Sequence, residues 1–347
     1  MGMKYDAILI VSFGGPEGPQ DVIPFLENVL RGKNVPRERM LEVAEHYYHF
    51  GGKSPINDQN RQLITALKVE LGIHGPNLPV YWGNRNWHPM LADTLRQMRT
   101  DGVTRALAFV TSAYSSYSGC RQYREDIARA QAAVGEKAPS VDKIRVFHNH
   151  PLFVEALVDR VRQSLEQIPE DRRQKTQLLF TAHSIPAVMA QNCSYEEQLR
   201  DTGKLVAEAV GQPTWRLVYQ SRSGPPSQPW LEPDILDALR ELQSATDSRD
   251  VVIAPIGFVS DHLEVLFDLD IQARELCQDL GLNMIRSATA GTHPKFITMI
   301  RELIEERMEE GRPHLALGAF GPRPDFCPVD CCPAPQRPAP TIERPRE

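Results

Sequence analysis

Short hydrophobic runs alternate along the chain with longer stretches whose apolar residues recur every three or four positions. The short runs predict strands, and the longer stretches predict amphipathic helices. The expected strands are 7–11, 80–82, 106–110, 177–181, 216–219, 251–255 and 284–286. The expected helices are 21–30, 60–71, 90–99, 121–134, 152–166, 195–210, 233–242, 261–280 and 295–310. This order predicts an α/β fold, with parallel sheets that carry helices on both faces.

The two halves of the chain repeat one plan. Loops of small and polar residues follow four of the predicted strands, at 12–16, 111–116, 182–186 and 255–262. Open α/β sheets place their sites beyond the carboxyl ends of strands, so we expect these loops to meet at a cleft between two similar domains. We therefore expect Rossmann-like domains at 1–147 and 148–321, followed by a proline- and cysteine-rich tail at 322–347.

Composition narrows the class of protein. The chain has 347 residues, of which 41% are hydrophobic, and this is enough for two modest domains. The net charge of −6 is spread along the chain without a basic block, which argues against a nucleic-acid partner. No apolar segment approaches the roughly 18 residues that span a bilayer, and no signal peptide is recognisable. We expect a soluble, cytoplasmic protein with no transmembrane segment.

His183 is the first chemical candidate. It follows a predicted strand and precedes Ser184-Ile185-Pro186. Because Pro186 disfavours helix at Ile185, the imidazole is expected on a fixed turn at the carboxyl end of the strand. A histidine there can accept a proton or bind a metal near neutral pH. For a lone histidine, however, a simple hydrogen bond within the loop is the more common case.

A second candidate begins the helix predicted at 261–280. Glu264 and Asp268 are four residues apart, so they share one helical face, which Gln272 continues. Apolar residues surround them in the sequence. Carboxylates in such a setting can bind a cation or pass protons along. An exposed acidic stripe on a surface helix is an equally good interpretation of this segment alone.

These segments together resemble the ferrochelatase family. The run from Thr181 to Pro186 is similar to the family's His-Ser-Ile/Leu-Pro signature, and residues 257–266 are similar to its second signature, including Glu264. Further matching segments are 9–16, 51–57, 218–222, 224–225 and 229–231. The resemblance covers about residues 4–312 in order. In detail it is strongest to the soluble coproporphyrin ferrochelatases of Gram-positive-type bacteria.

The resemblance implies insertion of Fe²⁺ into coproporphyrin III, with both held between two Rossmann-like domains. His183 would take a pyrrole proton, bind the incoming iron, or do both. Glu264 would help to deliver iron or carry protons away, with His262 and Asp268 behind it. The implied partners are the porphyrin, Fe²⁺ and a downstream enzyme of heme synthesis.

The resemblance also implies contacts with the porphyrin. Ser54 and Tyr123 match positions on the propionate side, while Phe13 would pack on the ring and Trp230 would flank it. Further propionate candidates are Arg31, Arg85 and Arg121, since guanidinium pairs well with carboxylate. Two positions depart from the family. Phe13 replaces a tyrosine of some bacterial relatives, and Gln272 replaces an acidic residue of many.

The cysteines need a separate explanation. A cytoplasmic chain of this size should not hold its six cysteines as structural disulfides. Cys327, Cys331 and Cys332 lie within six residues on the tail. The resemblance implies a [2Fe–2S] cluster on these three and one distant cysteine, for which Cys120 is expected and Cys193 is the reserve. Zinc and free thiols are the alternatives.

Other functions are compatible with the same fold, because a fold alone does not determine an activity. The protein could use protoporphyrin IX instead, or carry a porphyrin or metal without turnover. His183 and Glu264 together favour turnover, since a carrier needs neither a proton acceptor nor a path for a cation. Cobalt or nickel chelatases are usually smaller and carry extra histidine ligands, which this sequence does not show.

Overall fold

The structure of the protein is a computed structural model that describes residues 4–33, 35–224, 227–245 and 248–335. Eight strands lie in these residues, and they form two sheets. The strands of the first sheet are β1 (Ala7–Ser12), β2 (Val80–Asn84), β3 (Arg105–Val110) and β4 (Ser140–Lys143). Those of the second are β5 (Gln177–His183), β6 (Trp215–Gln220), β7 (Asp250–Ala254) and β8 (Asn283–Arg286).

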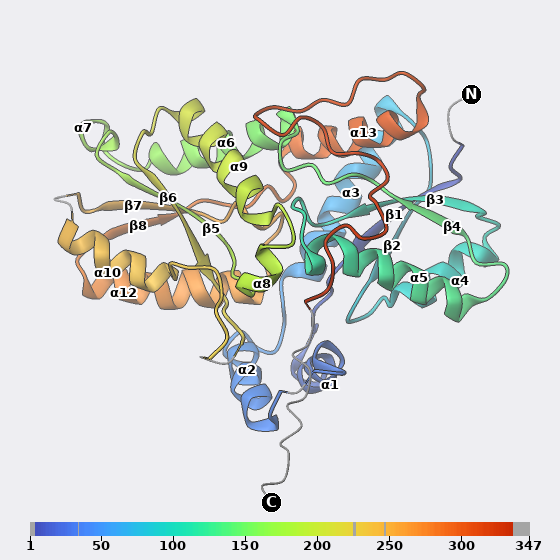
Figure 1. Cartoon of the computed structure of the whole chain (residues 1–347), viewed down its shortest axis with the longest axis horizontal. Coiled ribbons are helices and arrows are strands. Elements are labelled where there is room, and N and C mark those ends of the chain that lie inside the picture. The colour runs from blue at the N-terminus through green and yellow to red at the C-terminus, as the bar shows by residue number, and fades with distance from the viewer. Residues whose placement is uncertain (1–3, 34, 225–226, 246–247, 336–347) are drawn as a thin grey trace, which may run out of the picture.

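All neighbouring strands are parallel, and the two sheets have equivalent orders, β2-β1-β3-β4 and β6-β5-β7-β8. The sheets lie side by side as two lobes, each flanked by helices (Figure 1). The predicted α/β fold and the repeated plan are therefore confirmed.

The helices connect these strands. In the first half they are α1 (Pro19–Leu30), α2 (Arg37–His49), α3 (Ile56–His74), α4 (Leu91–Thr100), the π-helical turn η1 (Tyr117–Arg121) and α5 (Gln122–Val134). They continue with α6 (Pro151–Leu165), α7 (Glu170–Arg173), α8 (Ala187–Ala190), α9 (Tyr195–Val210), α10 (Ile235–Ala245), α11 (Leu263–Val265), π-helical η2 (Leu266–Ala273), α12 (Arg274–Asp279) and α13 (Pro294–Met308). None of the helices in the described residues is long and apolar enough to cross a membrane.

Strand β4 and helix α2 were not predicted, and neither were the short turns η1, α7 and α8. Both β4 and α2 have a weak hydrophobic signal. Strand β4 contains one apolar residue, Val141, and lies at the edge of its sheet. Helix α2 buries only Met40, Ala44 and Tyr47, and its other residues are mostly polar. The helix predicted at 261–280 is present but not uniform, because its middle part, η2, is π-helical.

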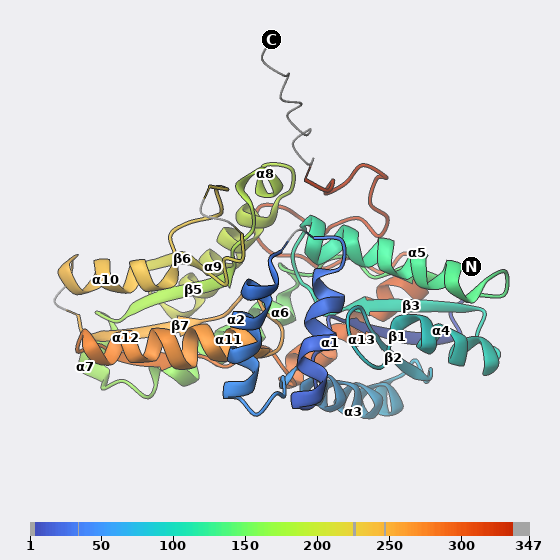
Figure 2. The ribbon, with the colours of Figure 1, turned by 90° about the horizontal axis from the view of Figure 1, so that it is seen from below.

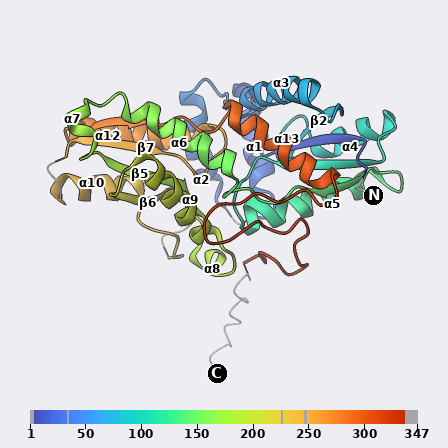
Figure 3. The same ribbon diagram turned by 90° about the horizontal axis from the view of Figure 1, so that it is seen from above.

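Both sheets share one hydrophobic core. It contains apolar residues of β1, β3, β5 and β7 together with helices α3, α6, α9 and α13. Phe147, Phe153 and Phe296 meet within it at centroid distances of 5.4 to 6.0 Å. Helix α13, although last in the chain, lies beside α3 of the first half and α6 of the second (Figure 3). The domain boundary at 147/148 therefore stays a prediction.

Helices α1 and α2 pack together across the centre of the molecule, between the two lobes (Figure 2). Their buried contacts include Phe25, Met40 and Tyr47, and the same cluster contains Leu263 of α11. A segment of the first half is thus packed directly beside Glu264, which follows Leu263.

The described part of the C-terminal tail is docked onto the body of the protein (Figure 1). The side-chain amide of Asn149 donates to the carbonyls of Leu317 and Gly321 at 3.0 and 2.9 Å. The guanidinium of Arg307 pairs with Asp325 at 3.2 Å. These contacts hold the tail at least as far as the cysteines. Residues 336–347 of the predicted tail lie outside the described residues.

Candidate active site and cysteine cluster

The candidate active site lies where the strand order of the second sheet reverses. Strand β5 has β6 on one side and β7 on the other, which makes the end of β5 a topological switch point. His183 is the last residue of β5, and Glu264 follows the loop after β7. The imidazole Nε2 of His183 lies 3.4 Å from a carboxylate oxygen of Glu264. The two residues singled out in the sequence are therefore brought together.

The ring of His183 is held from its other side. Its Nδ1 contacts the carbonyl of Ser184, which can only accept a hydrogen bond. Nδ1 therefore carries the proton in the neutral imidazole, so Nε2 is the nitrogen that gains or loses a proton, and when protonated it donates to Glu264. The hydroxyl of Tyr195 donates to the backbone carbonyl of His183 at 3.1 Å. Because the His183 side chain is 34% exposed and that of Glu264 is 48% exposed, a substrate can reach both.

Each member of this pair changes the pKa of the other. Burial opposes a charge on His183, but the hydrogen bond and charge of Glu264 outweigh it and raise the pKa of His183. Burial likewise opposes a charge on Glu264, yet the bond and charge of His183 lower the pKa of Glu264 to about 2. At neutral pH Glu264 is therefore a carboxylate beside a histidine that takes up protons readily.

Asp268, four residues after Glu264, is the next carboxylate of the site. Its carboxylate accepts hydrogen bonds from the hydroxyl of Ser221 and from the side-chain amide of Gln220, the latter at 3.3 Å. Ser221 has a φ of 61°, in the left-handed region. Burial, with a contribution from the charge of Glu264, raises the pKa of Asp268 to about 6. This carboxyl group can gain and lose a proton near neutral pH.

His262 precedes Glu264 and is the N-terminal cap residue of α11. Its ring meets that of Phe258 edge-on, with centroids 4.9 Å apart. Burial lowers the pKa of His262, and the charge of His183 adds to this effect. The neutral form of His262 is therefore favoured beside the charged pair of His183 and Glu264.

Three residues of the first half lie close to Glu264 and were not expected from the sequence. The charge of Glu264 acts on the pKa values of Lys33, His46 and Tyr47, which lie just before or within α2. The ring of His46 stacks on Phe267 at 3.7 Å. Because the sequence pattern did not reveal α2, nothing in the sequence placed these side chains at the site.

The predicted porphyrin-contacting residues fall into two groups. Phe13 is half-exposed at the end of β1, and the backbone of Trp230 pairs with that of Pro186, three residues after His183. Ser54 and Tyr123, by contrast, are buried. Their roles stay predictions.

The three candidate arginines differ in their surroundings. Arg85 is buried, pairs with Asp126 and lies 3.7 Å above the ring of Tyr123. Arg121 pairs with Glu125 at 3.1 Å and donates to the carbonyl of Cys331. Arg31 is exposed. Arg85 and Arg121 are thus engaged in contacts within the protein, whereas Arg31 can reach a ligand.

Four cysteine thiols gather where the tail meets the first half. Cys120 is buried in η1, and a hydrogen bond from Cys327 lowers the pKa of Cys120 to about 5, against the effect of burial. The sulfur atoms of Cys331 and Cys332 are 3.5 Å apart. The charge of Cys331 also raises the pKa of Cys327, and the charge of Cys120 raises the pKa of Cys332. The thiols therefore form two neighbouring pairs.

Of the other two cysteines, Cys193, the reserve candidate, also lies near the cluster, because it interacts electrostatically with Cys331 and Cys332. The thiol of Cys193 donates to the carbonyl of Met189 at 3.2 Å, and burial raises its pKa. Cys277 is buried within α12. Within the described part of the chain, no group of three or more histidine, cysteine or acidic side chains surrounds a single metal position.

The sequence profile of the ferrochelatase family matches residues 5–308. The ferrochelatase of Rhodopirellula baltica is 61% identical over 328 residues, which are 94% of this chain and 93% of that protein. The protein named coproporphyrin III ferrochelatase in Streptomyces coelicolor is 52% identical over 352 residues, covering 95% of this chain and 94% of the relative.

Solved structures agree with the fold. SirB from Bacillus subtilis with Fe³⁺ superposes with a TM-score of 0.55 at 12% identity, over 88% of this chain and 99% of that one. CbiX, described as the terminal enzyme of siroheme biosynthesis in denitrifying bacteria, superposes with a TM-score of 0.52 at 14% identity. The superposition covers 87% of this chain and 100% of that one. These structures share the fold, and the family profile and the sequence relatives show that the chain belongs to the ferrochelatase family.

Proposed function

We propose that this protein inserts ferrous iron into coproporphyrin III during heme synthesis. The observation that carries the proposal is the approach of His183 to Glu264 at the switch point of the second sheet. A proton acceptor and a carboxylate are the two groups that metal insertion requires. Relatives named coproporphyrin III ferrochelatase share about half of their residues with nearly the whole chain, which supports this choice of porphyrin.

The reaction exchanges two protons for one metal ion. A free-base porphyrin carries two inner N–H groups, and both protons must leave as Fe²⁺ binds the four nitrogens. The oxidation state of iron does not change. The Nε2 lone pair of His183 accepts a pyrrole proton, binds the incoming iron, or does both in turn. The nearby charge of Glu264 favours the protonated imidazole that results.

The carboxylates beside His183 complete the proton path. Glu264 is ionised at neutral pH, so it can bind Fe²⁺ weakly and stabilise the charge of the imidazolium that forms when His183 takes a proton. Asp268, whose pKa is about 6, is suited to pass that proton on. Imidazole and carboxylate also hold a borderline cation loosely enough to release it, whereas thiolates would hold it tightly.

For the porphyrin itself, Phe13 would pack on the ring and Trp230 would flank it. Ser54 and Tyr123 are both buried, so each would bind a propionate only after a local movement. For Ser54 the turn at 51–55 would have to move, and for Tyr123 the guanidinium of Arg85 that lies over its ring. Phe13 carries no oxygen and cannot serve as an axial ligand.

Turnover with each porphyrin tests the proposed function. We expect Fe²⁺ under anaerobic conditions to metallate coproporphyrin III faster than protoporphyrin IX. His183→Ala should lower kcat about 10² to 10⁴ fold, the range for removal of a general base. The exposed His74 on α3 provides the control His74→Ala. Failure to metallate either porphyrin, with binding intact, would favour a carrier, and full activity of His183→Ala would contradict the assigned role.

We further propose that Cys120, Cys327, Cys331 and Cys332 hold a [2Fe–2S] cluster. The two thiol pairs suit it, because each of its two irons takes two cysteine ligands. Zinc, which needs all four ligands around one position, is the alternative occupant of these thiols. When bound, the cluster supplies iron–sulfur bonds that join the tail to the first half.

The colour and composition of the purified protein test the cluster. Anaerobically prepared protein should be reddish brown and contain two iron and two sulfide per chain, as a [2Fe–2S] cluster does. Cys120→Ser should lose both, whereas Cys277→Ser, which alters another buried thiol, should keep them. Colourless wild-type protein without sulfide would refute the assignment. A cytoplasmic location and delivery of the product to a downstream enzyme are proposed from the family resemblance alone.

A further inference from the structure

The guanidinium of Arg286 joins two carboxylates that lie on either side of Glu264 in the chain. Arg286 is the last residue of β8, the strand next to β7. Its Nε donates to the carboxylate of Asp270 at 2.7 Å, and its Nη1 donates to that of Asp261 at 3.1 Å. Asp261 lies three residues before Glu264, and Asp270 lies six residues after it. One side chain therefore holds both ends of the segment 261–270, which carries the carboxylates of the proposed site.

This contact is largely shielded from water. The exposed fractions of the three side chains are 15% for Arg286, 17% for Asp261 and 24% for Asp270. Salt screens such ion pairs much less than it screens pairs on the surface. Because guanidinium is planar and its N–H groups point in fixed directions, it also sets where the two carboxylates lie relative to each other. Asp270 has a second, more exposed partner in Arg274, at 3.5 Å.

Between its two ends, the segment is held mainly by apolar side chains. Val265 and Leu269 are fully buried in the core of the second sheet, and Leu263 packs with α1 and α2. Apolar packing is not directional, whereas hydrogen bonds to a guanidinium are. The backbone N–H of Asp261 adds one bond to the first half, to the side-chain oxygen of Gln59 on α3 at 2.8 Å. Arg286 therefore supplies directional contacts at both ends of a segment that is otherwise packed mainly by apolar contacts.

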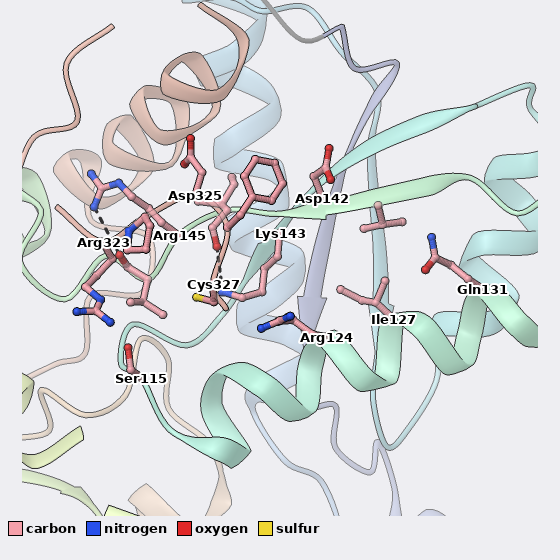
Figure 4. A pocket seen from close by; sticks show the side chains of 15 residues that line it. Ser115, Arg124, Ile127, Gln131, Asp142, Lys143, Arg145, Arg323, Asp325 and Cys327 are labelled. Atoms are coloured by element: carbon pink, nitrogen blue, oxygen red, sulfur yellow. Dashed lines mark hydrogen bonds between the residues drawn. The ribbon is translucent and has the colours of Figure 1, made fainter. Parts of the chain in front are cut away.

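The first half of the chain has an arginine near the equivalent place. Strand β4 takes the same position in its sheet that β8 takes in the second. Arg145 follows β4, and Figure 4 shows its side chain in the wall of a cavity that is also lined by Asp325 of the tail. It binds Glu306 of α13 at 2.9 Å. In each half, an arginine near the end of the edge strand thus binds carboxylates, and in the second half those carboxylates flank Glu264.

We propose that Arg286 is a positioning residue for metal insertion, which holds the segment 261–270 so that the carboxylate of Glu264 stays beside Nε2 of His183. The reaction that it serves rests on the proposed function, whereas the contact between Glu264 and His183 does not. Arg286 acts through the backbone of the segment. Without their common partner, Asp261 and Asp270 can move apart, and Glu264, which lies between them in the chain, moves away from the imidazole.

Arg286→Lys tests this role, because it keeps the positive charge and removes the planar fork. The pKa of His183, measured by NMR titration of the protein without substrate, should fall toward its value in Glu264→Gln. The kcat for coproporphyrin III should fall by up to about 10² fold, the cost of misplacing a reacting group by about 1 Å. The KM for the porphyrin should change little, since Arg286 is not among the proposed porphyrin contacts.

Arg301→Lys is the matched control. Arg301 also joins carboxylates of two elements, Glu70 of α3 at 2.9 Å and Glu305 of α13 at 2.6 Å, and its side chain is 17% exposed. In chemical denaturation it should lose about as much stability as Arg286→Lys. It should keep the wild-type kcat and the wild-type pKa of His183, because neither carboxylate lies in the segment that carries Glu264.

The two variants together separate a positioning role from a merely structural one. An unchanged pKa of His183 in Arg286→Lys, or an equal fall in Arg301→Lys, would overturn the proposal. If the wild type metallates neither porphyrin while the pKa of His183 still falls in Arg286→Lys alone, the proposed function fails and the positioning of Glu264 by Arg286 is supported.

Discussion

At the scale of single residues, His183 and Glu264 work as a unit because each sets the protonation of the other. The raised pKa of His183 contributes stability that is complete below its ordinary pKa of 6.5 and is lost as the pH rises through the folded value. The lowered pKa of Glu264 contributes stability above its ordinary value of 4.5, which is lost as the pH falls toward 2. The pair is thus most favourable in weakly acidic solution.

Replacement of Glu264 by glutamine should lower the pKa of His183, because burial is then opposed only by the smaller contributions of the Ser184 carbonyl and Asp268. NMR titration of isotope-labelled histidine measures this pKa directly. The acidic limb of the pH profile of kcat/KM should move to lower pH by the same amount. Glu196→Gln, which changes an exposed carboxylate on α9, is the control. An unchanged pKa of His183 in Glu264→Gln would show that the 3.4 Å contact does not set it.

At the scale of elements, helix α9 controls the position of His183. It carries Tyr195, whose hydroxyl bonds to the backbone carbonyl of His183. The helix can approach the sheet because Gly203 has no side chain. A Cβ at that position would lie 3.0 Å from the ring of Phe180 and 3.2 Å from that of Trp215. Phe180 is fully buried, so it has no room to withdraw.

Gly203→Ala should therefore destabilise the protein by about 1–3 kcal/mol, the usual cost of overpacking a core. The loss should appear in chemical denaturation, with lower activity because Tyr195 moves with the helix. Gly72→Ala in α3 is the matched control, since a Cβ there meets nothing within 4 Å. That change should stabilise the protein by about 0.4–1 kcal/mol. Equal stability of the two variants would mean that α9 can shift freely.

At the scale of the whole molecule, a buried ion pair joins the C-terminal part of the chain to the first half. The guanidinium of Arg145, just after β4, bonds to both carboxylate oxygens of Glu306 on α13 at 2.9 and 3.0 Å. It also donates to the carbonyl of Leu315 at the start of the tail. Both side chains are almost fully buried. This pair couples the first half, the last helix and the tail.

Arg145→Met should destabilise the protein by about 3–5 kcal/mol, because it leaves the charge of Glu306 buried without a partner. The double variant Arg145→Met with Glu306→Leu should recover much of this loss, since two apolar groups then fill the site. Equilibrium unfolding measures both changes. Arg96→Met, which breaks an exposed pair with Asp93, should cost less than about 1 kcal/mol. A single variant as stable as the wild type would contradict the role of this pair.

The sequence by itself determined the α/β fold, because each central strand is a continuous apolar run that has to be buried from both sides. Strands β1 and β7 are fully buried, and both were predicted. It also singled out His183 and Glu264 as candidates, because they follow strands that open sheets use for their sites and lie in segments that resemble the family's two signatures. Strand β4 and helix α2 were not predicted because they are mostly polar and show no periodic hydrophobic pattern.

Only the tertiary structure decided how those residues meet. Contacts between residues far apart in the chain leave no trace in local periodicity. The structure therefore brought Glu264 to 3.4 Å from His183, placed Lys33 beside it, and made the helix at 266–273 π-helical. The pairing of Cys120 with Cys327 arises in the same way, since it depends on where the tail docks.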